Sequence, residues 1–487
     1  MTNNGSPNLK NRAHQAMLDA GFHPDFPPEI LRQVQAPKNL TPIIPNGKIQ
    51  DLRGLLWSSI DNDTSRDLDQ VEYAEALPDG TVRLLVGVAD VDYVVPAGSA
   101  IDQHATSETV SVYTGVVTFP MLPIELSYDQ TSLNPGQDRQ ALVMEMHIRP
   151  SGEVICHDLF GAQLRNHAQL TYNSVGAWLE GTGPIPPAVA NVPGLDAQLR
   201  LQFETSKHLR DLRRTRGSLN FASLEPVPVL ENGELAGLAT FQHNAAEDII
   251  ESFMVAANVA MAEHLKKAGA LSIRRVVKTP KRWDRIQAVA SLYGVKLPAS
   301  PDPRPLSDFL DQRRAADPMH FPDLSLSIIR LMGPGEYIVE HPGQEHEGHF
   351  GLAVQDYSHS TAPNRRFVDL VTQRLVKAAA NDAPSPYAEG ELGAIARHCT
   401  EREDAARTVE RLMRKIMAAS LLSHRIGEMF DGIITGATPK GTFVRLLKMP
   451  AEGMVVGGAN GIDVGDKVRV RLTGVDINRG FIDFERK

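Results

Sequence analysis

The sequence contains little cysteine and no long apolar run. Cys156 and Cys399 are the only cysteines among its 487 residues, and they form no CxxC pair. A disulfide framework and a thiolate zinc site are therefore excluded, as is typical of a protein in a reducing compartment. No stretch approaches the roughly 18 apolar residues of a membrane span, and residues 1–15 contain no apolar signal-peptide core. We expect a cytoplasmic protein that has no membrane partner.

The sequence also lacks an excess of basic residues. Lys and Arg number 50 against 59 Asp and Glu, which gives a formal net charge of −9. A molecule of this charge does not attract polyanions indiscriminately, so any nucleic-acid site must be local. With 42% hydrophobic and 22% charged residues, the composition is that of a globular protein, and disordered, collagen-like and fibrous classes are excluded.

Hydrophobic periodicity predicts an α+β fold in three parts. Residues 1–46 have the pattern of a small helical region and a Pro/Asn/Gly-rich linker. Within residues 47–429, strand-like alternation occurs at 82–88, 141–148 and 153–158. Helical spacing follows at 196–216, 245–268, 283–293 and 367–380, giving a mixed sheet/helix core. Residues 430–487 show about five short strands separated by glycines, which is the size of an all-β OB-fold barrel. This tail has nine Lys and Arg against seven Asp and Glu.

A cluster of aspartates lies just before the predicted sheet. The segment 59–70 (SIDNDTSRDLDQ) contains Asp61, Asp63, Asp67 and Asp69. Their spacing allows all four to lie on one face of an extended backbone. Carboxylates this close raise one another's pKa unless a cation lies among them, and their hard oxygens favour Mg²⁺, Mn²⁺ or Ca²⁺. The cluster is therefore a candidate metal site.

Two other interpretations of this cluster remain open. One is a solvated acidic turn. The other is a calcium loop, because counting from Asp61 places oxygen-bearing side chains at positions 3, 5, 7, 9 and 12. Arg66 stands where such a loop needs glycine, and the turn 78–80 (PDG) interrupts the helix that an EF-hand requires after its loop.

A second motif lies some 300 residues further along the chain, at 349–374. In it, the turn around Pro363 places Arg365 and Arg366 at the start of a predicted helix over 367–380. Guanidinium groups presented in this way can bind phosphate through paired hydrogen bonds. The alternative for either arginine is a salt bridge at the helix start, and Arg366 is the better candidate for that role.

With further motifs, these two segments resemble the ribonuclease II/ribonuclease R (RNB) family of 3′→5′ exoribonucleases. The further motifs are SVY (111–113), FPMLPIELS (119–127), LTY (170–172), RGSLNF (216–221) and ESFMVAAN (251–258). The resemblance covers about residues 51–380, and the tail resembles the S1-type OB domain of that family. The family usually begins with cold-shock-type OB domains, and residues 1–46 are too few for one, so we expect none here.

The resemblance implies a magnesium-dependent enzyme that processively hydrolyses single-stranded RNA from its 3′ end to nucleoside 5′-monophosphates. Two Mg²⁺ ions, replaceable by Mn²⁺, would supply the reaction's water activation and charge neutralisation. The implied ligands are Asp61, Asp67 and Asp69, with Asp63 and Gln70 at the periphery. Asp69 is implied to be the most critical of them, and Gln70 stands where the family often has an aspartate. Arg365 would face the phosphate in the manner of an arginine finger.

The resemblance also implies residues that hold the RNA. Tyr113 and Phe221 match aromatics that bracket the last bases, Tyr172 matches one near the scissile phosphate, and Glu251 matches a contact to the terminal nucleotide. Stacking of this kind contributes about 1–3 kcal/mol per base. For Phe221 the alternative is a place in the apolar core. Arg366 is another expected RNA contact, with a helix-start salt bridge as its alternative. Arg275 belongs to a run of basic residues that fits an RNA path, with a solvated helix face as its alternative. Lys440 and Phe443 lie on a stretch of the tail where S1-type domains commonly meet RNA, and the alternative for Phe443 is the barrel core.

The neutral side chain of Gln70 leaves two functions to be distinguished. One is the active exoribonuclease, and the other is an RNA-binding or regulatory relative whose active site has decayed. A calcium-binding regulator is a third hypothesis, which follows from the calcium-loop interpretation. We expect a monomer whose partner is the 3′ end of single-stranded RNA, and no protein partner is evident.

Overall fold

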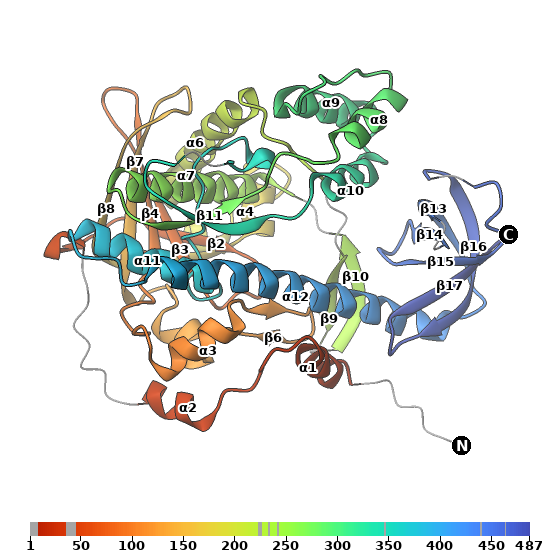
Figure 1. Cartoon of the computed structure of the whole chain (residues 1–487), viewed down its shortest axis with the longest axis horizontal. Helices are drawn as coiled ribbons and strands as arrows, with labels where there is room; N and C mark the ends of the chain where they lie inside the picture. Colours follow the sequence, from red (N-terminus) through yellow and green to blue (C-terminus); the bar gives the residue numbers. More distant parts are fainter. Residues whose placement is uncertain are drawn as a thin grey trace.

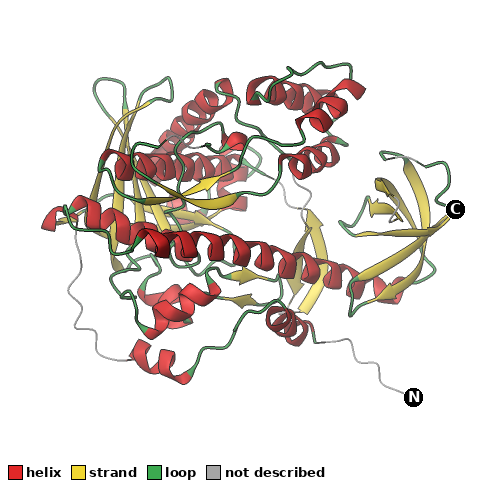
Figure 2. Ribbon diagram, in the orientation of Figure 1, coloured by secondary structure: helices red, strands yellow, loops and turns green. Residues whose placement is uncertain are grey.

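The computed structural model describes residues 8–35, 45–222, 226–231, 234–240, 243–344, 347–438, 441–462 and 464–487. Within these residues the chain folds into an α+β core, a small helical N-terminal region and a closed C-terminal barrel (Figures 1 and 2). The fold class expected from the sequence is therefore confirmed. In the described part of the chain, none of the helices is apolar over enough length to cross a bilayer.

The core is built on a six-stranded mixed sheet in the order β1-β8-β2-β3-β4-β7. Its strands are β1 (Ile49–Asp51), β2 (Trp57–Asp61), β3 (Gln70–Ala76), β4 (Val82–Ala89), β7 (Asp138–Ile148) and β8 (Val154–Thr171). The long strand β8 pairs antiparallel with β7 and parallel with β1 and β2. Strand β4 is an almost unbroken apolar run because most of its side chains are buried.

Helices cover the sheet and one of them extends beyond it. The helices of the core are α4 (Tyr172–Leu179), α5 (Pro187–Ala190), α6 (Leu195–Thr215), α7 (Ala245–Lys267), α11 (Phe367–Ala380) and α12 (Glu389–Leu422). Helix α7 begins with a capping box in which Asn244 and Glu247 bond each other's backbone N–H groups. Figure 1 shows α12 running from the core towards the barrel.

A smaller helical group has an apolar core of its own. Helices α8 (Trp283–Leu292), α9 (Pro303–Ala316) and α10 (Phe321–Met332) bury a cluster that includes Trp283, Phe309 and Ile328. Two antiparallel strand pairs lie between the larger elements. They are β11 (Ser272–Val276) with β12 (Glu336–Glu340), and β9 (Pro226–Glu231) with β10 (Glu234–Thr240).

The C-terminal barrel closes in the order β13-β14-β15-β17-β16. Its strands are β13 (Met429–Thr438), β14 (Gly441–Leu446), β15 (Glu452–Gly457), β16 (Lys467–Asp476) and β17 (Phe481–Arg486). Alternate residues such as Val444, Leu472 and Phe484 fill its interior. Arg445 forms two hydrogen bonds to Asp323 of α10, at 2.8 and 3.1 Å, which join the barrel to the smaller helical group.

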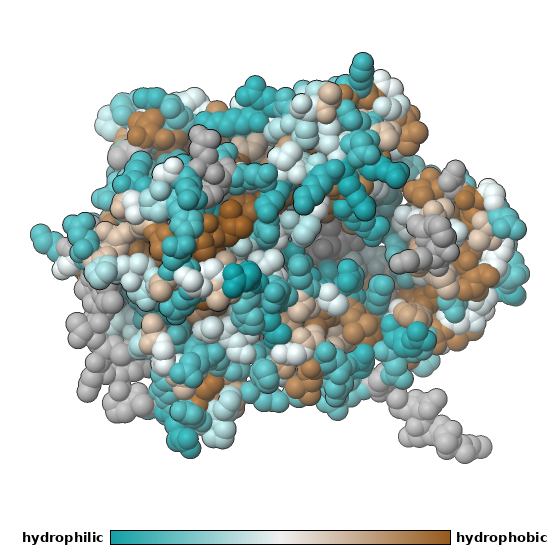
Figure 3. Space-filling model, in the orientation of Figure 1, coloured by the Kyte–Doolittle hydropathy of each residue, from teal (hydrophilic) through white to brown (hydrophobic). Residues whose placement is uncertain are grey.

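The first helix of the N-terminal region lies along α12 together with a short hairpin, and the second helix packs against α3 (Ala100–Glu108). The region contains α1 (Leu9–Asp19) and α2 (Pro28–Gln35), and the hairpin consists of β5 (Val112–Tyr113) and β6 (Thr118–Phe119) after α3. The small helical lead-in expected from the sequence is present in residues 8–35. Figure 3 shows a mainly hydrophilic face on which apolar residues form small, separate patches.

Candidate active site

The aspartate cluster occupies the loop between β2 and β3. Ser132 fixes the shape of this loop, because its Oγ accepts from the Leu68 N–H at 3.0 Å and donates to the Arg66 carbonyl at 2.8 Å. The loop is flanked by two strands of one sheet, so it is not the helix-loop-helix of an EF-hand. Asp69 is only 2% exposed, which also distinguishes the segment from a solvated turn.

Asp69 is the point at which the two distant sequence motifs meet. Arg365 Nε donates to Asp69 Oδ2 at 3.0 Å, and the Asn364 N–H donates to Oδ1 at 2.9 Å. Burial raises the pKa of Asp69 to about 7, although the positive charge of Arg365 acts in the opposite direction. A buried carboxylate with a bonded guanidinium partner is therefore present where the sequence predicted the centre of the site.

Asp61 and Asp67 lie beside this pair. Asp61 ends β2, and its Oδ2 atom is buried without a hydrogen bond in the described structure. Burial raises the pKa of Asp61 to about 7, and the negative charge of Asp67 also raises it. Asp67 in turn accepts a hydrogen bond from the hydroxyl of Tyr113 at 2.5 Å. We call Asp61, Asp67 and Asp69 the acidic centre.

The two peripheral ligands implied by the resemblance have other surroundings. Asp63 is exposed, and its Oδ2 accepts from Asn173 Nδ2 at 2.9 Å. Gln70 is the first residue of β3, is 7% exposed and pairs with Val88 of β4. The structure therefore gives Asp63 a polar partner outside the acidic centre and places Gln70 in the buried sheet.

Helix α11 and the residues just before it hold Arg365 in place. The Arg365 carbonyl accepts from the Ser111 N–H at 3.0 Å, so the segments that carry Arg365 and Tyr113 are joined through their backbones. Near its middle, α11 is fixed to the last residue of β4, because Gln373 Nε2 donates to the Ala89 carbonyl at 2.7 Å.

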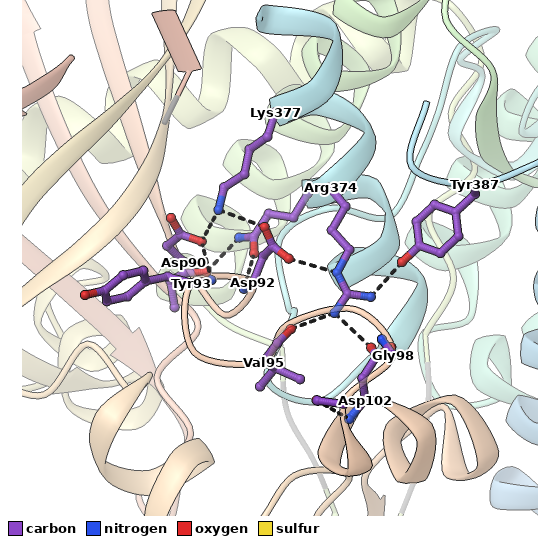
Figure 4. Close-up of polar contacts among 12 residues, drawn as sticks. Asp90, Asp92, Tyr93, Val95, Gly98, Asp102, Arg374, Lys377 and Tyr387 are labelled. Atoms are coloured by element: carbon purple, nitrogen blue, oxygen red, sulfur yellow. Dashed lines mark hydrogen bonds and ion pairs between the residues drawn. The ribbon is translucent and has the colours of Figure 1, made fainter. Parts of the chain in front are cut away.

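A buried ionic network strengthens the attachment of α11 (Figure 4). Arg374 forms ion pairs with Asp92 at 2.9 Å and Asp102 at 2.8 Å, and it also bonds the Tyr387 hydroxyl at 2.6 Å. Lys377 bonds Asp90 at 2.6 Å and Asp92 at 3.1 Å. Because these charges are buried and paired, the network fixes the helix that presents Arg365.

The hairpin β5–β6 brings Tyr113 to the acidic centre. Besides the bond from its hydroxyl to Asp67, the Tyr113 backbone N–H donates to Glu410 Oε1 of α12 at 3.2 Å. Sequence reasoning did not identify Glu410. A single glutamate in a long charged helix is typical of a solvent-facing position, and the sequence carries no signal that this one meets a hairpin 297 residues away.

Tyr172 and Glu251 lie on a cavity next to the acidic centre. They line it together with Asn62, His243, Glu247 and Ile250, and its volume is about 300 Å³. Burial raises the pKa of the Tyr172 hydroxyl, and so does the negative charge of Asp61. Glu251 lies 3.6 Å from Arg213. The structure thus places both residues, which are 79 positions apart in the sequence, at one opening.

Other residues expected to contact RNA are engaged elsewhere. Phe221 packs partly buried against the cluster of α8, α9 and α10. Arg366 bonds Asp369 at 2.8 Å, the helix-start salt bridge given as its alternative. Arg275 is 5% exposed on β11, bonds Glu403 at 2.6 Å and lies over the ring of Tyr337.

Arg275 therefore lies neither on a surface that faces RNA nor on a solvated helix face. Its neighbourhood is a buried strand, and its guanidinium is held by Glu403 instead of facing a ligand. In the barrel, Phe443 is partly buried on β14. Lys440, which was also expected to contact RNA, lies outside the described residues.

Comparisons with known proteins agree with the two domains seen here. The RNB domain model matches residues 49–382, and the model of the RNase II-type exonuclease C-terminal S1 domain matches residues 428–487. Ribonuclease R 1 of Lactococcus lactis is 29% identical, over 95% of this chain and 59% of that protein. Ribonuclease R of Aquifex aeolicus is 30% identical, over 94% of this chain and 68% of that protein. The chain thus spans about three fifths to two thirds of the length of these relatives.

Solved structures share the fold. Mycoplasma genitalium RNase R in complex with ribose-methylated single-stranded RNA has a TM-score of 0.86 at 23% identity, over 99% of this chain and 78% of that one. Yeast Ssd1, described as a pseudonuclease, has a TM-score of 0.73 at 17% identity, over 97% of this chain and 58% of that one. A fold shared with a pseudonuclease does not by itself establish catalysis. The two matched domains show that the chain belongs to the RNB family and carries an RNase II-type S1 domain after its RNB domain.

Proposed function

We propose that this chain is a magnesium-dependent exoribonuclease that processively degrades single-stranded RNA from its 3′ end and releases nucleoside 5′-monophosphates. The observation that carries the proposal is the 3.0 Å contact between Arg365 and Asp69, which joins two segments 296 residues apart. Asp61 and Asp67 lie beside this contact, and Tyr113 reaches Asp67 from a third segment. The same residues were expected to act together because of the family resemblance.

The acidic centre offers oxygen ligands that suit Mg²⁺. The unpartnered buried oxygen of Asp61 and the neighbouring carboxylate of Asp67 are hard donors. In the described part of the chain, no three His, Cys, Asp or Glu side chains converge as a ready-made metal cage. Mg²⁺ is often held by one or two carboxylates while water and substrate phosphate complete its coordination. Asp61 and Asp67 would hold the ion, with Asp69 at its side.

A divalent cation bound there would polarise the phosphate and activate a water molecule. In the hydrolysis, the water oxygen bonds to the last phosphorus and releases a proton to solvent, while the bond from that phosphorus to the 3′ oxygen of the preceding nucleotide breaks. The 3′ oxygen takes up a proton to become a hydroxyl, and the terminal nucleotide leaves as its 5′-monophosphate. Arg365 supplies positive charge to the phosphate oxygens. Its side chain is 41% exposed, so phosphate can reach the guanidinium while Asp69 holds Nε.

The aromatic residues hold the RNA end without reading its sequence. Tyr113 is 41% exposed beside Asp67, which suits stacking on a base close to the reacting phosphate. The cavity lined by Tyr172 and Glu251 is of a size to take the terminal nucleotide. Repeated binding of a new 3′ end in this cavity, while upstream bases remain stacked, supports processive degradation.

A degradation assay tests the proposal. Single-stranded RNA labelled at its 5′ end is incubated with the protein in Mg²⁺, in Mn²⁺ or in EDTA. We expect a short labelled end fragment and nucleoside 5′-monophosphates with either metal, and intact RNA in EDTA. Degradation that continues in EDTA, or labelled mononucleotide as the first product, would contradict the proposal.

The neutral Gln70 supports a second candidate, an RNA-binding relative that does not cleave. Gln70 is buried at the start of β3, immediately after Asp69, where the resemblance has a further aspartate. An amide is a weaker ligand for a hard cation than a carboxylate. RNA that binds the protein but stays intact with both metals in the same assay would favour this second candidate.

A further inference from the structure

We propose that helix α1 is a positioning element for Tyr113, so that the N-terminal region determines how firmly the last bases of the RNA are held. The inference rests on the proposed function, since it concerns the aromatic side chain that would stack on RNA. It assigns a role to a helix that contributes no side chain to the acidic centre. Helix α1 packs on the face of the hairpin β5–β6 that points away from the acidic centre.

The two faces of the hairpin have opposite environments. Val112 is completely buried, whereas the next residue, Tyr113, is 41% exposed and bonds Asp67. This alternation is the normal consequence of strand geometry. On the other strand, the ring of Phe119 lies 6.1 Å from the ring of His14 in α1. The face away from Tyr113 is therefore the face that contacts the N-terminal helix.

This face is covered by α1 and α12 together. Val112 belongs to an apolar cluster distinct from the main core, formed with buried residues of both helices. Helix α1 supplies Ala13, Ala16 and Met17, and α12 supplies Ala406, Val409, Met413 and Ile416. Figure 1 shows α1 beside α12 near β6. The hairpin is thus packed between two helices, one of which is N-terminal.

The turn after α1 fixes that helix to the rest of the molecule. The guanidinium of Arg402 in α12 lies 3.6 Å from the ring centroid of Phe22, and the His23 N–H donates to Glu108 Oε2 at 2.9 Å. Glu108 is the last residue of α3 and is followed directly by the segment that leads to Tyr113. Helix α1 is therefore attached both to the helix behind the hairpin and to the residues that enter it.

The hairpin has little stability of its own. Each strand contains two residues, and the register consists of the pairs Val112 with Phe119 and Tyr113 with Thr118. A two-stranded hairpin of this size is not independently stable in water. Its position must come from its packing, so a loss of apolar contact on the α1 side lets Tyr113 move relative to Asp67.

Two neighbouring substitutions in α1 test the proposal. Met17 is 2% exposed and faces the hairpin cluster, whereas Leu18 is 44% exposed on the same helix. The affinity for a short single-stranded RNA is measured by fluorescence anisotropy in EDTA, where no hydrolysis occurs. We expect Met17→Ala to raise the Kd by about tenfold, the size of a lost stacking contact, and Leu18→Ala to leave it unchanged.

The same substitution in a Tyr113→Ala background separates positioning from general destabilisation. If α1 acts through Tyr113, Met17→Ala has no further effect on Kd once the aromatic ring is gone. A full additional increase in the double variant would overturn the proposal, and so would an unchanged Kd in Met17→Ala alone. His14→Ala, which removes the ring next to Phe119, serves as the second variant if Met17→Ala does not fold.

The outcomes distinguish this inference from the proposed function. RNA that is degraded normally, with Kd values insensitive to Met17, contradicts only the positioning role of α1. Wild-type protein that neither binds nor degrades RNA contradicts the proposed function itself. The length of the final undigested fragment gives an independent measure, because a displaced Tyr113 releases the RNA at a longer length.

Discussion

Asp69 has the environment of a residue that organises its neighbours. It is almost fully buried, and both of its carboxylate oxygens accept hydrogen bonds from the segment 364–365. A hydrogen bond to a charged partner in a buried setting is stronger than a neutral one, so this pair fixes the orientation of the guanidinium. The loss of one carboxylate charge therefore affects both the cation site and Arg365.

We predict that Asp69→Asn abolishes hydrolysis while RNA binding is nearly retained. The amide cannot replace the charge, and a fall in the rate of about 10³-fold or more is expected for loss of this electrostatic support. Binding persists because stacking does not use this carboxylate. Single-turnover degradation and anisotropy binding measure the two effects. Wild-type turnover in the variant would refute the assignment, and Asp308→Asn, at an exposed aspartate of α9, is the control.

Tyr113 and Phe221 should differ when each is replaced by alanine. Tyr113 reaches Asp67, so its loss is expected to lengthen the final undigested fragment with little change in stability. Phe221 packs against the apolar cluster of α8, α9 and α10, so its loss is expected to lower the free energy of unfolding by about 1–3 kcal/mol. Gel analysis of end products and urea denaturation check these outcomes. An unchanged end product in Tyr113→Ala would remove this residue from the RNA grip.

At the residue scale, the structure brings together charged residues that several sequence motifs supported. Asp61, Asp67, Asp69 and Arg365 could be proposed together because the motifs occur in the right order, and the structure brings them to one place. A run of basic residues gave no such support for Arg275. Its burial depends on strand pairing with β12 and on Glu403, neither of which is visible in local sequence.

At the scale of elements, α11 shows how a helix can be fixed at both ends. The Phe367 N–H donates to the Thr109 carbonyl at 2.8 Å at the start of the helix, and the ionic network of Figure 4 lies towards its end. The charged side chains of this network are at most 11% exposed. Buried charges of this kind lower stability strongly when one partner is removed.

We predict that Arg374→Met destabilises the protein by about 3–5 kcal/mol, because Asp102 is left buried without its ion-pair partner and Asp92 keeps only Lys377. The variant should also turn over RNA more slowly, since α11 presents Arg365. Urea denaturation and single-turnover rates measure the two effects. Arg32→Met, at an exposed position of α2, is the control and should alter neither. Wild-type stability in Arg374→Met would show that the network does not fix the helix.

Strand β3 carries a buried acid that the proposed mechanism does not use. Glu72 is fully buried, and neither of its carboxylate oxygens makes a hydrogen bond in the described structure. Burial raises its pKa well above the ordinary value of 4.5, and the negative charge of Asp61 also raises it. The folded protein therefore keeps the proton over a pH range in which the unfolded chain has lost it.

This difference predicts that Glu72 lowers stability as pH rises. Its contribution to folding is fully present below its ordinary pKa and is lost as pH increases towards the higher pKa of the folded state. Glu72→Gln removes that dependence, so the variant should gain stability relative to wild type between about pH 5 and about pH 8. Urea denaturation at both pH values tests this, with Glu75→Gln, 45% exposed on the same strand, as control. If the free energy of unfolding of Glu72→Gln, relative to that of wild type, falls as pH rises, the prediction is contradicted.

Elements with simple periodicity could be predicted, and those with mixed patterns could not. Helices α6, α7, α8 and α11 lie within one residue of the predicted segments 196–216, 245–268, 283–293 and 367–380. Strand β8 was expected only over 153–158, but it continues to Thr171. Polar residues such as Arg165 and Asn166 interrupt its apolar alternation, and they are accommodated by Asp138 and by the Leu133 carbonyl.

At the scale of the whole molecule, the proposed site depends on segments from four regions of the chain. The sheet provides the acidic centre, α11 is preceded by Arg365, the hairpin provides Tyr113, and α12 supports that hairpin through Glu410. Local sequence predicts each region separately. The way in which they meet depends on tertiary packing, and only the family resemblance indicated it in advance.

The barrel shows the same division between local and long-range information. Its short strands and glycines predicted an OB-type fold, and the closed five-stranded order confirms it. The attachment to α10 through Arg445 and Asp323 was not predicted, because a single arginine on a strand does not reveal its partner. Arg445 thus joins two parts of the protein.

The most direct test of the central claim is anomalous diffraction from crystals of the wild-type protein soaked with Mn²⁺ and ribose-methylated single-stranded RNA. We predict a manganese peak about 2 Å from carboxylate oxygens of Asp61 and Asp67, with RNA phosphate among its ligands and Arg365 on the opposite side. An acidic centre that contains no manganese while RNA occupies the neighbouring cavity would contradict the account.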